Sequence, residues 1–216
     1  YAGEIEDARE EVRNNPDDAE AHYNLGNAYS KLGKYKEAIE SYKQAIRIDP
    51  DSADAHYNLG LAYGKSGRYE EAIESYKQAI RINPDFAGAH NNLGYAYYNL
   101  GKYKEAIESY KQAIRIDPDY AKAHYNLGDA YYDSGKWKEA IESFKQAIRI
   151  NPDDASAHGN LGNAYCKLGY YKKAIESYKQ VIRIDPDDVD AHFNLGLTYI
   201  ILKDRGSAME QYKILK

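Results

Sequence analysis

The strongest constraint on this chain is a sequence period of 34 residues. The stretch AEAHYNLGNAYSKLGKYKEAIESYKQAIRIDPDS, residues 19–52, returns with small changes four times in full and a fifth time in part. The six prolines keep the same period, at positions 16, 50, 84, 118, 152 and 186. A fixed period of 20–50 residues is the signature of a repeat array, in which each unit buries its apolar face against its neighbours.

Each unit predicts two helices. Residues 19–32 place small and apolar side chains such as Leu25 at helical spacing, and Gly33 is expected to end this helix in a left-handed conformation. Residues 35–48 predict a second helix with Tyr42 on its buried face and alternating Lys and Glu on its wet face. The unit is therefore a helical hairpin.

The period also predicts how the units begin and end. Pro50 stops the second helix, and Asp51 is expected to cap the first helix of the next unit. Residues 1–18 form either a capping helix or the second half of a further repeat. Five complete repeats follow without linkers, at 19–52, 53–86, 87–120, 121–154 and 155–188.

Residues 189–216 predict a truncated and atypical sixth repeat, in which Lys203 stands where the earlier units have glycine. Four apolar side chains of this unit would lack a covering helix: Met209, Tyr212, Ile214 and Leu215. Either more protein follows, or this end pairs with another chain.

The unit resembles the tetratricopeptide repeat. The residues that carry the resemblance are His22, Leu25, Gly26 and Tyr29, then Ala38 and Tyr42, then Pro50. The family pattern has Trp at the position of His22 and Phe at that of Tyr42, and both exchanges keep a planar ring. The resemblance implies an all-α, right-handed superhelix (solenoid) of tandem 34-residue helix-turn-helix repeats. In that family the first helices line a concave groove that holds a partner peptide.

The exposed stripe of the first helices differs from unit to unit and is rich in aromatic residues, which solvation alone does not require. The resemblance makes it the candidate peptide-binding surface, with Asn27, Lys31, Tyr57, Lys65, Tyr95, Tyr98, Tyr125, Asp129, Tyr132, Asp133, Asn163 and Lys167. Lys31 and Lys65 favour an acidic group of the partner near the amino end. Asp129 and Asp133, among tyrosines, favour a Lys or Arg of the partner in the middle.

One asparagine per repeat borders that stripe: Asn24, Asn58, Asn92, Asn126, Asn160 and Asn194. These side chains either bond to a neighbouring helix or form a ladder for a peptide backbone. Rungs ~10 Å apart match every third residue of an extended chain at ~3.3 Å per residue. At these positions the chain resembles the tetratricopeptide arm of O-GlcNAc transferase, which has such a ladder.

Chaperone-binding members of the family carry a Lys four residues before an Asn. Here that position holds Tyr23, Tyr57, Asn91, Tyr125, Gly159 and Phe193. A chaperone C-terminus is therefore not expected as the ligand.

Composition excludes several other classes of protein. The net charge is −5 and the basic residues are interleaved with Glu, which argues against nucleic acid as a partner. No apolar run is long enough to span a membrane. Cys166 is the only cysteine, so an internal disulfide is impossible. The six histidines share one repeat position, and sites ~10 Å apart cannot share one metal ion.

No catalytic arrangement stands out from the repeat background, and no metal or cofactor is expected. We therefore expect a non-enzymatic scaffold that binds an extended peptide or a partner protein, with the cytoplasm as the default location. Two alternatives stay open. The chain could be the substrate-recruiting arm of a larger enzyme, or a self-assembling module that forms homo-oligomers through exposed repeat ends.

Overall fold

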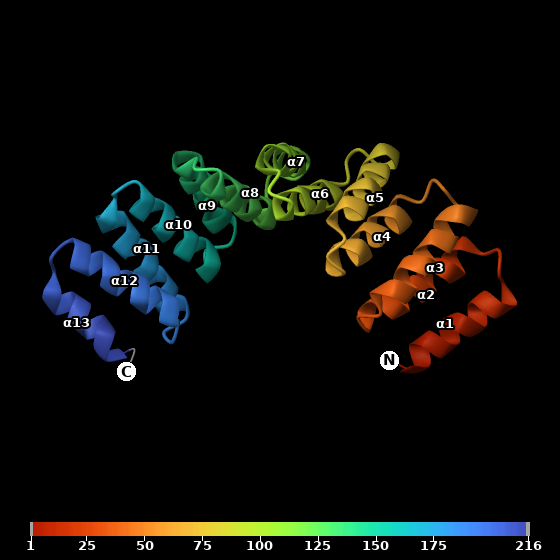
Figure 1. Ribbon diagram of the computed structural model, residues 1–216, viewed down its shortest axis with the longest axis horizontal. Coiled ribbons are helices and arrows are strands. Elements are labelled where there is room, and N and C mark those ends of the chain that lie inside the picture. The colour runs from red at the N-terminus through yellow and green to blue at the C-terminus, as the bar shows by residue number, and fades with distance from the viewer. Residues whose placement is uncertain (1, 215–216) are drawn as a thin grey trace. The chain divides into compact units, whose positions relative to one another are not determined.

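The computed structural model describes residues 2–214, and these residues form thirteen α-helices joined by short turns (Figure 1). The helices are α1 (Ala2–Asn14), α2 (Ala19–Lys31), α3 (Tyr35–Ile48), α4 (Ala53–Lys65), α5 (Tyr69–Ile82), α6 (Ala87–Asn99), α7 (Tyr103–Ile116), α8 (Ala121–Asp133), α9 (Trp137–Ile150), α10 (Ala155–Lys167), α11 (Tyr171–Ile184), α12 (Val189–Ile201) and α13 (Arg205–Ile214). The prediction of an all-α array of helical hairpins is confirmed.

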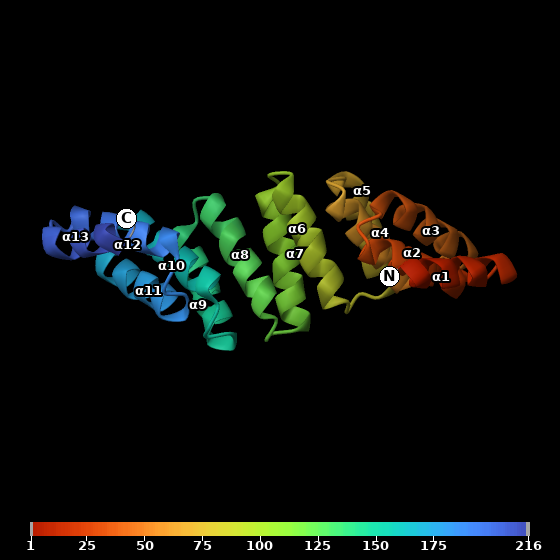
Figure 2. The same cartoon turned by 90° about the horizontal axis from the view of Figure 1, so that it is seen from below.

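The helices belong to two compact units, Tyr1–Ile116 with α1–α7 and Asp117–Lys216 with α8–α13. Within each unit every helix packs against the one that follows it (Figures 1 and 2). First helices of neighbouring repeats also touch, α2 with α4, α4 with α6, and α8 with α10. In the first unit α2, α4 and α6 therefore form a continuous face, and in the second unit α8 and α10 do the same.

In each complete repeat the two helices of the hairpin are held together by an aromatic ring that lies on a glycine. The Tyr42 ring of α3 is 2% exposed, and a Cβ added to Gly26 of α2 would lie only 2.5 Å from it. The same contact, at 2.5–2.7 Å, recurs in the other complete repeats at Gly60, Gly94, Gly128 and Gly162. Only glycine lets these helices approach so closely.

The turns follow the expected chemistry, with one correction. The turn glycines have φ of +70° to +77°, and Lys203 adopts φ +62° at the equivalent position. Ser52, not Asp51, caps α4: its hydroxyl accepts a hydrogen bond from the Ala55 N–H at 3.2 Å. Because α4 begins at Ala53, Asp51 lies one residue too early to reach the free N–H groups.

The six histidines tie each first helix to the loop before it. In every repeat, Nε2 lies 2.9–3.0 Å from the carbonyl oxygen of the proline six residues earlier, as in His22 with Pro16. Each ring thus fixes the angle at which the chain enters its helix.

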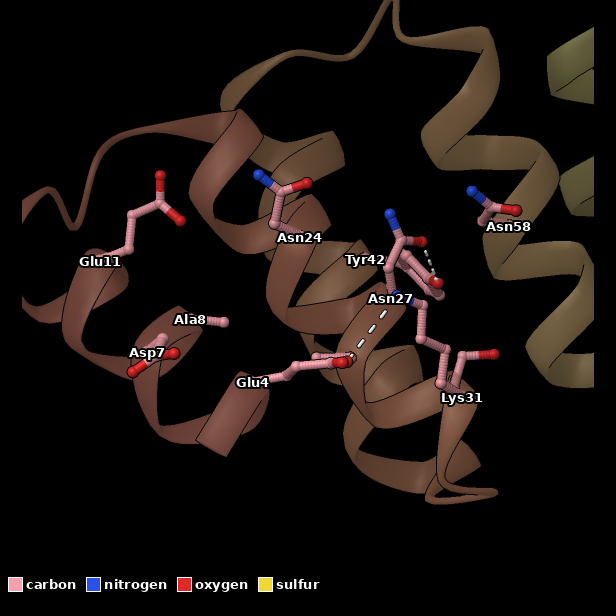
Figure 3. Close-up of a pocket in the computed structure, with 11 residues that line it drawn as sticks. Glu4, Asp7, Ala8, Glu11, Asn24, Asn27, Lys31, Tyr42 and Asn58 are labelled. Atoms are coloured by element: carbon pink, nitrogen blue, oxygen red, sulfur yellow. Dashed lines mark hydrogen bonds and ion pairs between the residues drawn. The ribbon is translucent and has the colours of Figure 1, made fainter. Parts of the chain in front are cut away.

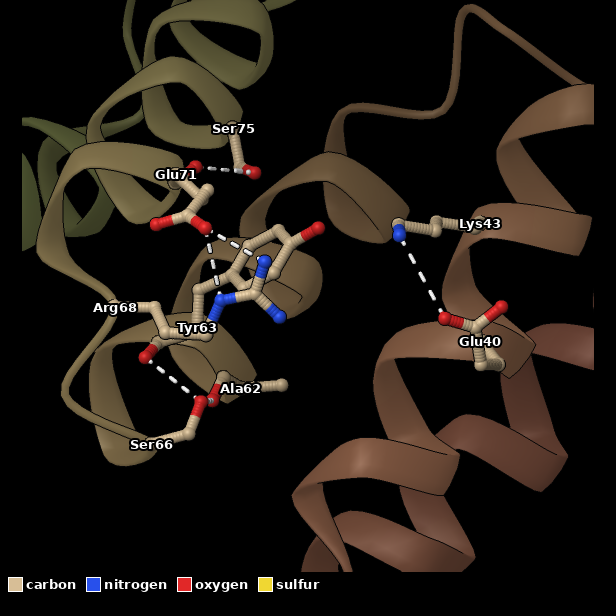
Figure 4. A network of polar contacts seen from close by, with 8 residues as sticks. All are labelled: Glu40, Lys43, Ala62, Tyr63, Ser66, Arg68, Glu71 and Ser75. Carbon is tan, nitrogen blue, oxygen red and sulfur yellow. Dashed lines mark hydrogen bonds and ion pairs between the residues drawn. The ribbon is translucent and has the colours of Figure 1, made fainter.

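The face formed by the second helices is a solvated, charged surface. The Arg68 side chain lies 4.6 Å from the centre of the Tyr63 ring and donates to Glu71 at 2.6 and 2.9 Å (Figure 4). Lys43 lies 6.0 Å from the same ring and pairs with Glu40 at 3.6 Å. Such exposed pairs contribute only a few tenths of a kcal/mol each.

The last hairpin departs from the others. In α13 no side chain is buried, and Tyr212, at the position of the packed Tyr42, is 53% exposed. A Cβ added to Gly196 of α12 would instead lie 3.4 Å from the Cβ of Gln211. Met209 and Ile214 are exposed, as expected, whereas Leu215 lies outside the described residues.

Candidate functional site

The eighteen candidate residues all lie on the first helices of the repeats, α2, α4, α6, α8, α10 and α12. Five are exposed: Lys31, Lys65, Tyr95, Asp133 and Lys167. Thirteen are half-buried: Asn24, Asn27, Tyr57, Asn58, Asn92, Tyr98, Tyr125, Asn126, Asp129, Tyr132, Asn160, Asn163 and Asn194. The side chains of the candidate surface are thus less exposed to solvent than the sequence pattern predicts.

Several of its tyrosines pack within the fold. Tyr57 lies 5.9 Å from the ring of Tyr76, measured between ring centres, and 4.6 Å from that of Phe86. Tyr98 meets the Tyr103 ring edge-on at 5.6 Å. By contrast, Tyr95 is 49% exposed, which makes it the tyrosine of this stripe most available to a ligand.

The asparagine row bonds partly to the fold itself. The Nδ2 of Asn58 donates to the hydroxyl of Tyr23, 35 residues earlier, at 2.7 Å. Asn92 and Asn160 repeat this bond with the preceding repeat at 2.9 and 3.1 Å. Asn24 and Asn194 make no side-chain hydrogen bond to any other described residue. The row therefore combines structural amides with amides that remain available.

A second polar position, three residues after each of these asparagines, is occupied differently in different repeats. The hydroxyl of Tyr42 donates to Asn27 Oδ1 at 2.7 Å, and that of Tyr178 donates to Asn163 Oδ1 at 2.8 Å. In the fourth repeat the second helix carries Phe144, which has no hydroxyl to donate, and the first helix carries Asp129.

The Asp129 carboxylate therefore forms its hydrogen bonds with groups other than a second-helix hydroxyl. Its Oδ1 accepts a hydrogen bond from Asn160 Nδ2 at 2.8 Å. Burial, together with the nearby carboxylates of Asp133 and Asp154, raises the pKa of the Asp129 carboxyl to about 7, although its hydrogen bonds with Asn160 and Tyr125 oppose the shift. This part of the surface is therefore acidic and sensitive to pH near neutrality.

A hollow of about 660 Å³ opens on the same face at the amino end, between α1, α2 and α4 (Figure 3). Lys31 lines it but pairs with Glu4 at 3.8 Å, and Asp7 and Glu11 add two more carboxylates. Three carboxylates and one ammonium group make this hollow acidic. The expectation that the amino end favours an acidic group of the partner stays a prediction, and the three carboxylates of α1 argue against it in this hollow.

A second hollow, of about 310 Å³, lies on this face between α8, α10, α11 and α12. It opens at Gly159, where the first, second and fourth repeats have tyrosine, and its walls include Asn160, Asn163 and Asn194. Sequence reasoning did not select Gly159. The signal was nevertheless present, because glycine stands at a position where four of the six repeats have an aromatic residue.

Tandem hairpins of constant length that bury their apolar faces against one another define the class of α-helical repeat proteins. Models of the TPR repeat match residues 26–67, 65–101, 94–134, 128–169 and 162–200, and tetratricopeptide repeat models match residues 8–40 and 189–213. The chain belongs to the tetratricopeptide repeat family. This family typically provides non-enzymatic scaffolds for protein interactions.

Solved structures are also similar to this chain over most of its length. MamA is 29% identical, with a TM-score of 0.72 over 75% of this chain and 95% of its own. YrrB, described as a TPR protein with an unusual peptide-binding site, is 25% identical, with a TM-score of 0.72 over 85% of this chain and 95% of its own.

The C-terminal part of a TPR repeat-containing protein from Cytophaga hutchinsonii covers the whole chain and 89% of its own length, with a TM-score of 0.84 at 20% identity. That likeness concerns the fold alone. No protein with a curated description matches the sequence. Within the described part of the chain, no helix combines the length and apolar character needed to cross a membrane.

Proposed function

We propose that this chain is a scaffold that binds an extended segment of a partner protein along the face that the first helices form within each of its two compact units. The observation that carries the proposal is the asparagine row, which places one side-chain amide per repeat on this face. The Asn24 and Asn194 amides, and the Oδ1 atoms of Asn58 and Asn160, make no hydrogen bond within the described part of the chain. Amides can both donate to and accept from a peptide backbone.

The charges of this face favour a basic segment. Carboxylates line the hollow at the amino end, and Asp129 and Asp133 lie on α8. Opposite charges on the two partners accelerate association and select the partner. The description of YrrB as a TPR protein with a peptide-binding site supports a peptide ligand for this chain as well.

A display screen of random peptides tests the proposal. The variant Tyr95→Ser/Asp133→Ser changes two exposed side chains of the first-helix face. Its control, Lys77→Ser/Lys145→Ser, changes two exposed side chains of the second-helix face. We expect selected peptides to be rich in Lys and Arg. We also expect them to bind the first variant at least about tenfold more weakly than the wild type, and the control within about twofold.

Selected peptides that bind the first-helix variant as tightly as the wild type would overturn the proposed surface. A screen that yields no binder would overturn peptide binding itself.

A second candidate function is self-association with another copy of the chain. It is favoured by a concentration of exposed apolar side chains at the carboxyl end, where Phe193 is 53% and Ile200 is 60% exposed on α12, and Met209 is 54% exposed on α13. Large exposed apolar patches mark interaction sites, and a patch with few charges can pair with itself around a two-fold axis. Sedimentation across protein concentrations tests this candidate: a dimer lost in Phe193→Ser/Ile200→Ser supports it, and a monomer at all concentrations rejects it.

A further inference from the structure

One position of the first helices has the same surroundings in three repeats. Tyr23, Tyr57 and Tyr125 each lie 5.9 Å, between ring centres, from the aromatic ring of their own second helix. Each hydroxyl also accepts a hydrogen bond from the asparagine of the following repeat, at 2.7, 2.9 and 3.1 Å. The repeat thus contains a built site for one tyrosine side chain, closed by a ring on one side and an amide on the other.

In the fifth repeat this tyrosine is missing and its surroundings remain. A Cβ added to Gly159 would meet only Val181 Cγ2, at 3.8 Å. The equivalent ring, Tyr178, and the equivalent amide, Asn194, both line the hollow there. Asn194 has no hydrogen-bond partner for its side chain among the described residues, whereas Asn58, Asn92 and Asn160 donate to a tyrosine.

Val181 fills only part of the vacancy. It stands where the other complete repeats have alanine, so it adds two methyl carbons in place of a whole phenol ring. The remaining hollow has a volume of about 310 Å³, within the ~300–1,000 Å³ range typical of ligand sites. A valine also offers no acceptor to the Asn194 amide, so the polar half of the site stays unoccupied.

The rim of this hollow is acidic. Its charged lining residues are Asp188 and Asp190, at the start of α12. The Asp188 side chain already accepts from the Ala191 N–H at 2.6 Å, which leaves the exposed Asp190 carboxylate facing solvent. A neutral phenol next to a basic residue suits this rim, and a phosphorylated or carboxylate group does not.

We propose that the hollow at Gly159 receives a tyrosine side chain of the partner peptide, with a Lys or Arg beside it in the sequence. The proposal rests on the proposed function and names the residue that the face selects. The ligand ring takes the place of the missing repeat tyrosine beside Tyr178, and its hydroxyl accepts from Asn194. The basic neighbour faces Asp190.

The test uses a capped peptide, acetyl-Gly-Lys-Ala-Tyr-Ala-Lys-Gly-amide, titrated into the ¹⁵N-labelled chain and followed by NMR. We expect the largest shift changes at Ser156, Asn160 and Asn194. The peptide with Phe for Tyr should bind several-fold more weakly, because one hydrogen bond is worth roughly a factor of five. The phosphotyrosine peptide should bind at least about tenfold more weakly.

The decisive variant is Gly159→Tyr/Val181→Ala, which restores the pair found in the first, second and fourth repeats and so fills the hollow. It should fold with a raised Tm and lose the shift changes at Asn194. The matched control, Lys145→Ser, changes an exposed side chain of α9 outside the hollow and should keep binding within about twofold. Equal binding to the filled variant, or equal binding of a Leu peptide, would overturn the proposal.

Two further outcomes separate this inference from the function on which it rests. If display selects peptides that bind without a tyrosine, the scaffold function holds and the tyrosine site is wrong. If the wild type self-associates and the filled variant is monomeric in sedimentation, the tyrosine comes from a second copy of the chain, which also overturns the proposed partner.

Discussion

Asp129 and Phe144 depart together from the pattern of the other repeats. Where Asn27 and Asn163 accept a hydrogen bond from a buried tyrosine hydroxyl, Asp129 faces a ring that cannot donate. The Asp129 carboxyl is half-buried there and accepts a hydrogen bond from Asn160, and its burial raises its pKa. This exchange gives the fourth repeat a titrating group near neutral pH.

We predict that Asp129→Asn stabilises the chain at pH 8 and has little effect at pH 4.5. The folded-state pKa of about 7 lies above the ordinary value near 4, so the stability contributed by the bound proton is complete below pH 4 and is lost as pH rises through 7. The gain in the free energy of unfolding at pH 8 should be on the order of 2 kcal/mol. Urea unfolding followed by circular dichroism at both pH values measures it.

Asp51→Asn is the matched control for this prediction, because the side chain of Asp51 is exposed and does not cap α4. It should change stability by a few tenths of a kcal/mol at either pH. An Asp129→Asn effect of the same size at both pH values would contradict the assigned pKa.

Lys203 is a second residue under local constraint. Its φ of +62° is one that glycine adopts freely and that costs other residues about 1 kcal/mol. Lys203→Gly should therefore raise the free energy of unfolding by about 1 kcal/mol, measured in urea. Lys179→Gly, inside α11, should lower it by a similar amount. Destabilisation by Lys203→Gly would show that the long side chain contributes more than the backbone strain costs.

At the scale of the helix, the glycine under the aromatic ring sets how closely the two helices of a hairpin pack. Helix α4 offers a matched pair of glycines that face the same tyrosine. A Cβ on Gly60 would lie 2.6 Å from the Tyr76 ring, and one on Gly64 would lie 3.8 Å from the Tyr76 hydroxyl.

Gly60→Ala should destabilise the chain by about 1–3 kcal/mol, because the ring is buried and has no room to move. Gly64→Ala should stabilise it by about 0.5–1 kcal/mol, because alanine favours the helix and the space is open. Thermal unfolding of both variants provides the comparison. Similar Tm values for the two variants would mean that the two helices of the hairpin can move apart without a loss of stability.

The helices themselves could be predicted from sequence because their signals are local. The period, the turn glycine at Gly33 and the spacing of Leu25 and Tyr42 require no knowledge of neighbouring repeats. The cap at Ser52 was missed by one residue, since the predicted start of α4 decides which side chain reaches the free N–H groups.

The candidate site was less predictable because it depends on contacts between repeats. Tyr57 lies on the side of its own helix that the sequence pattern predicts to be exposed to solvent. In the structure, Asn92 of the next repeat and Phe86, in the loop before α6, partly cover it. The acidic hollow at the amino end likewise depends on Glu4 and Glu11 of α1, outside the repeat pattern. Side chains from one repeat therefore decide what is exposed on another.

At the scale of the whole molecule, regular repeats provide the scaffold, and we expect their irregularities to provide selectivity. The second-helix faces are nearly identical from repeat to repeat and carry exposed pairs such as Glu74–Lys77. The first-helix face carries the departures, with Tyr95 exposed, Asp129 titrating and Gly159 leaving a vacancy. Such variation on one face is what recognition of a particular partner requires.

The most direct test of this account is the NMR footprint on the ¹⁵N-labelled chain of a peptide selected by display. We predict that the largest backbone shift changes fall on the first helices, α4, α6, α8, α10 and α12, and include Tyr95 and Asn160. The second-helix face around Glu74 and Lys77 should stay unchanged. A footprint centred on that second-helix face, or confined to α13, would contradict the central claim that the first helices form the binding surface.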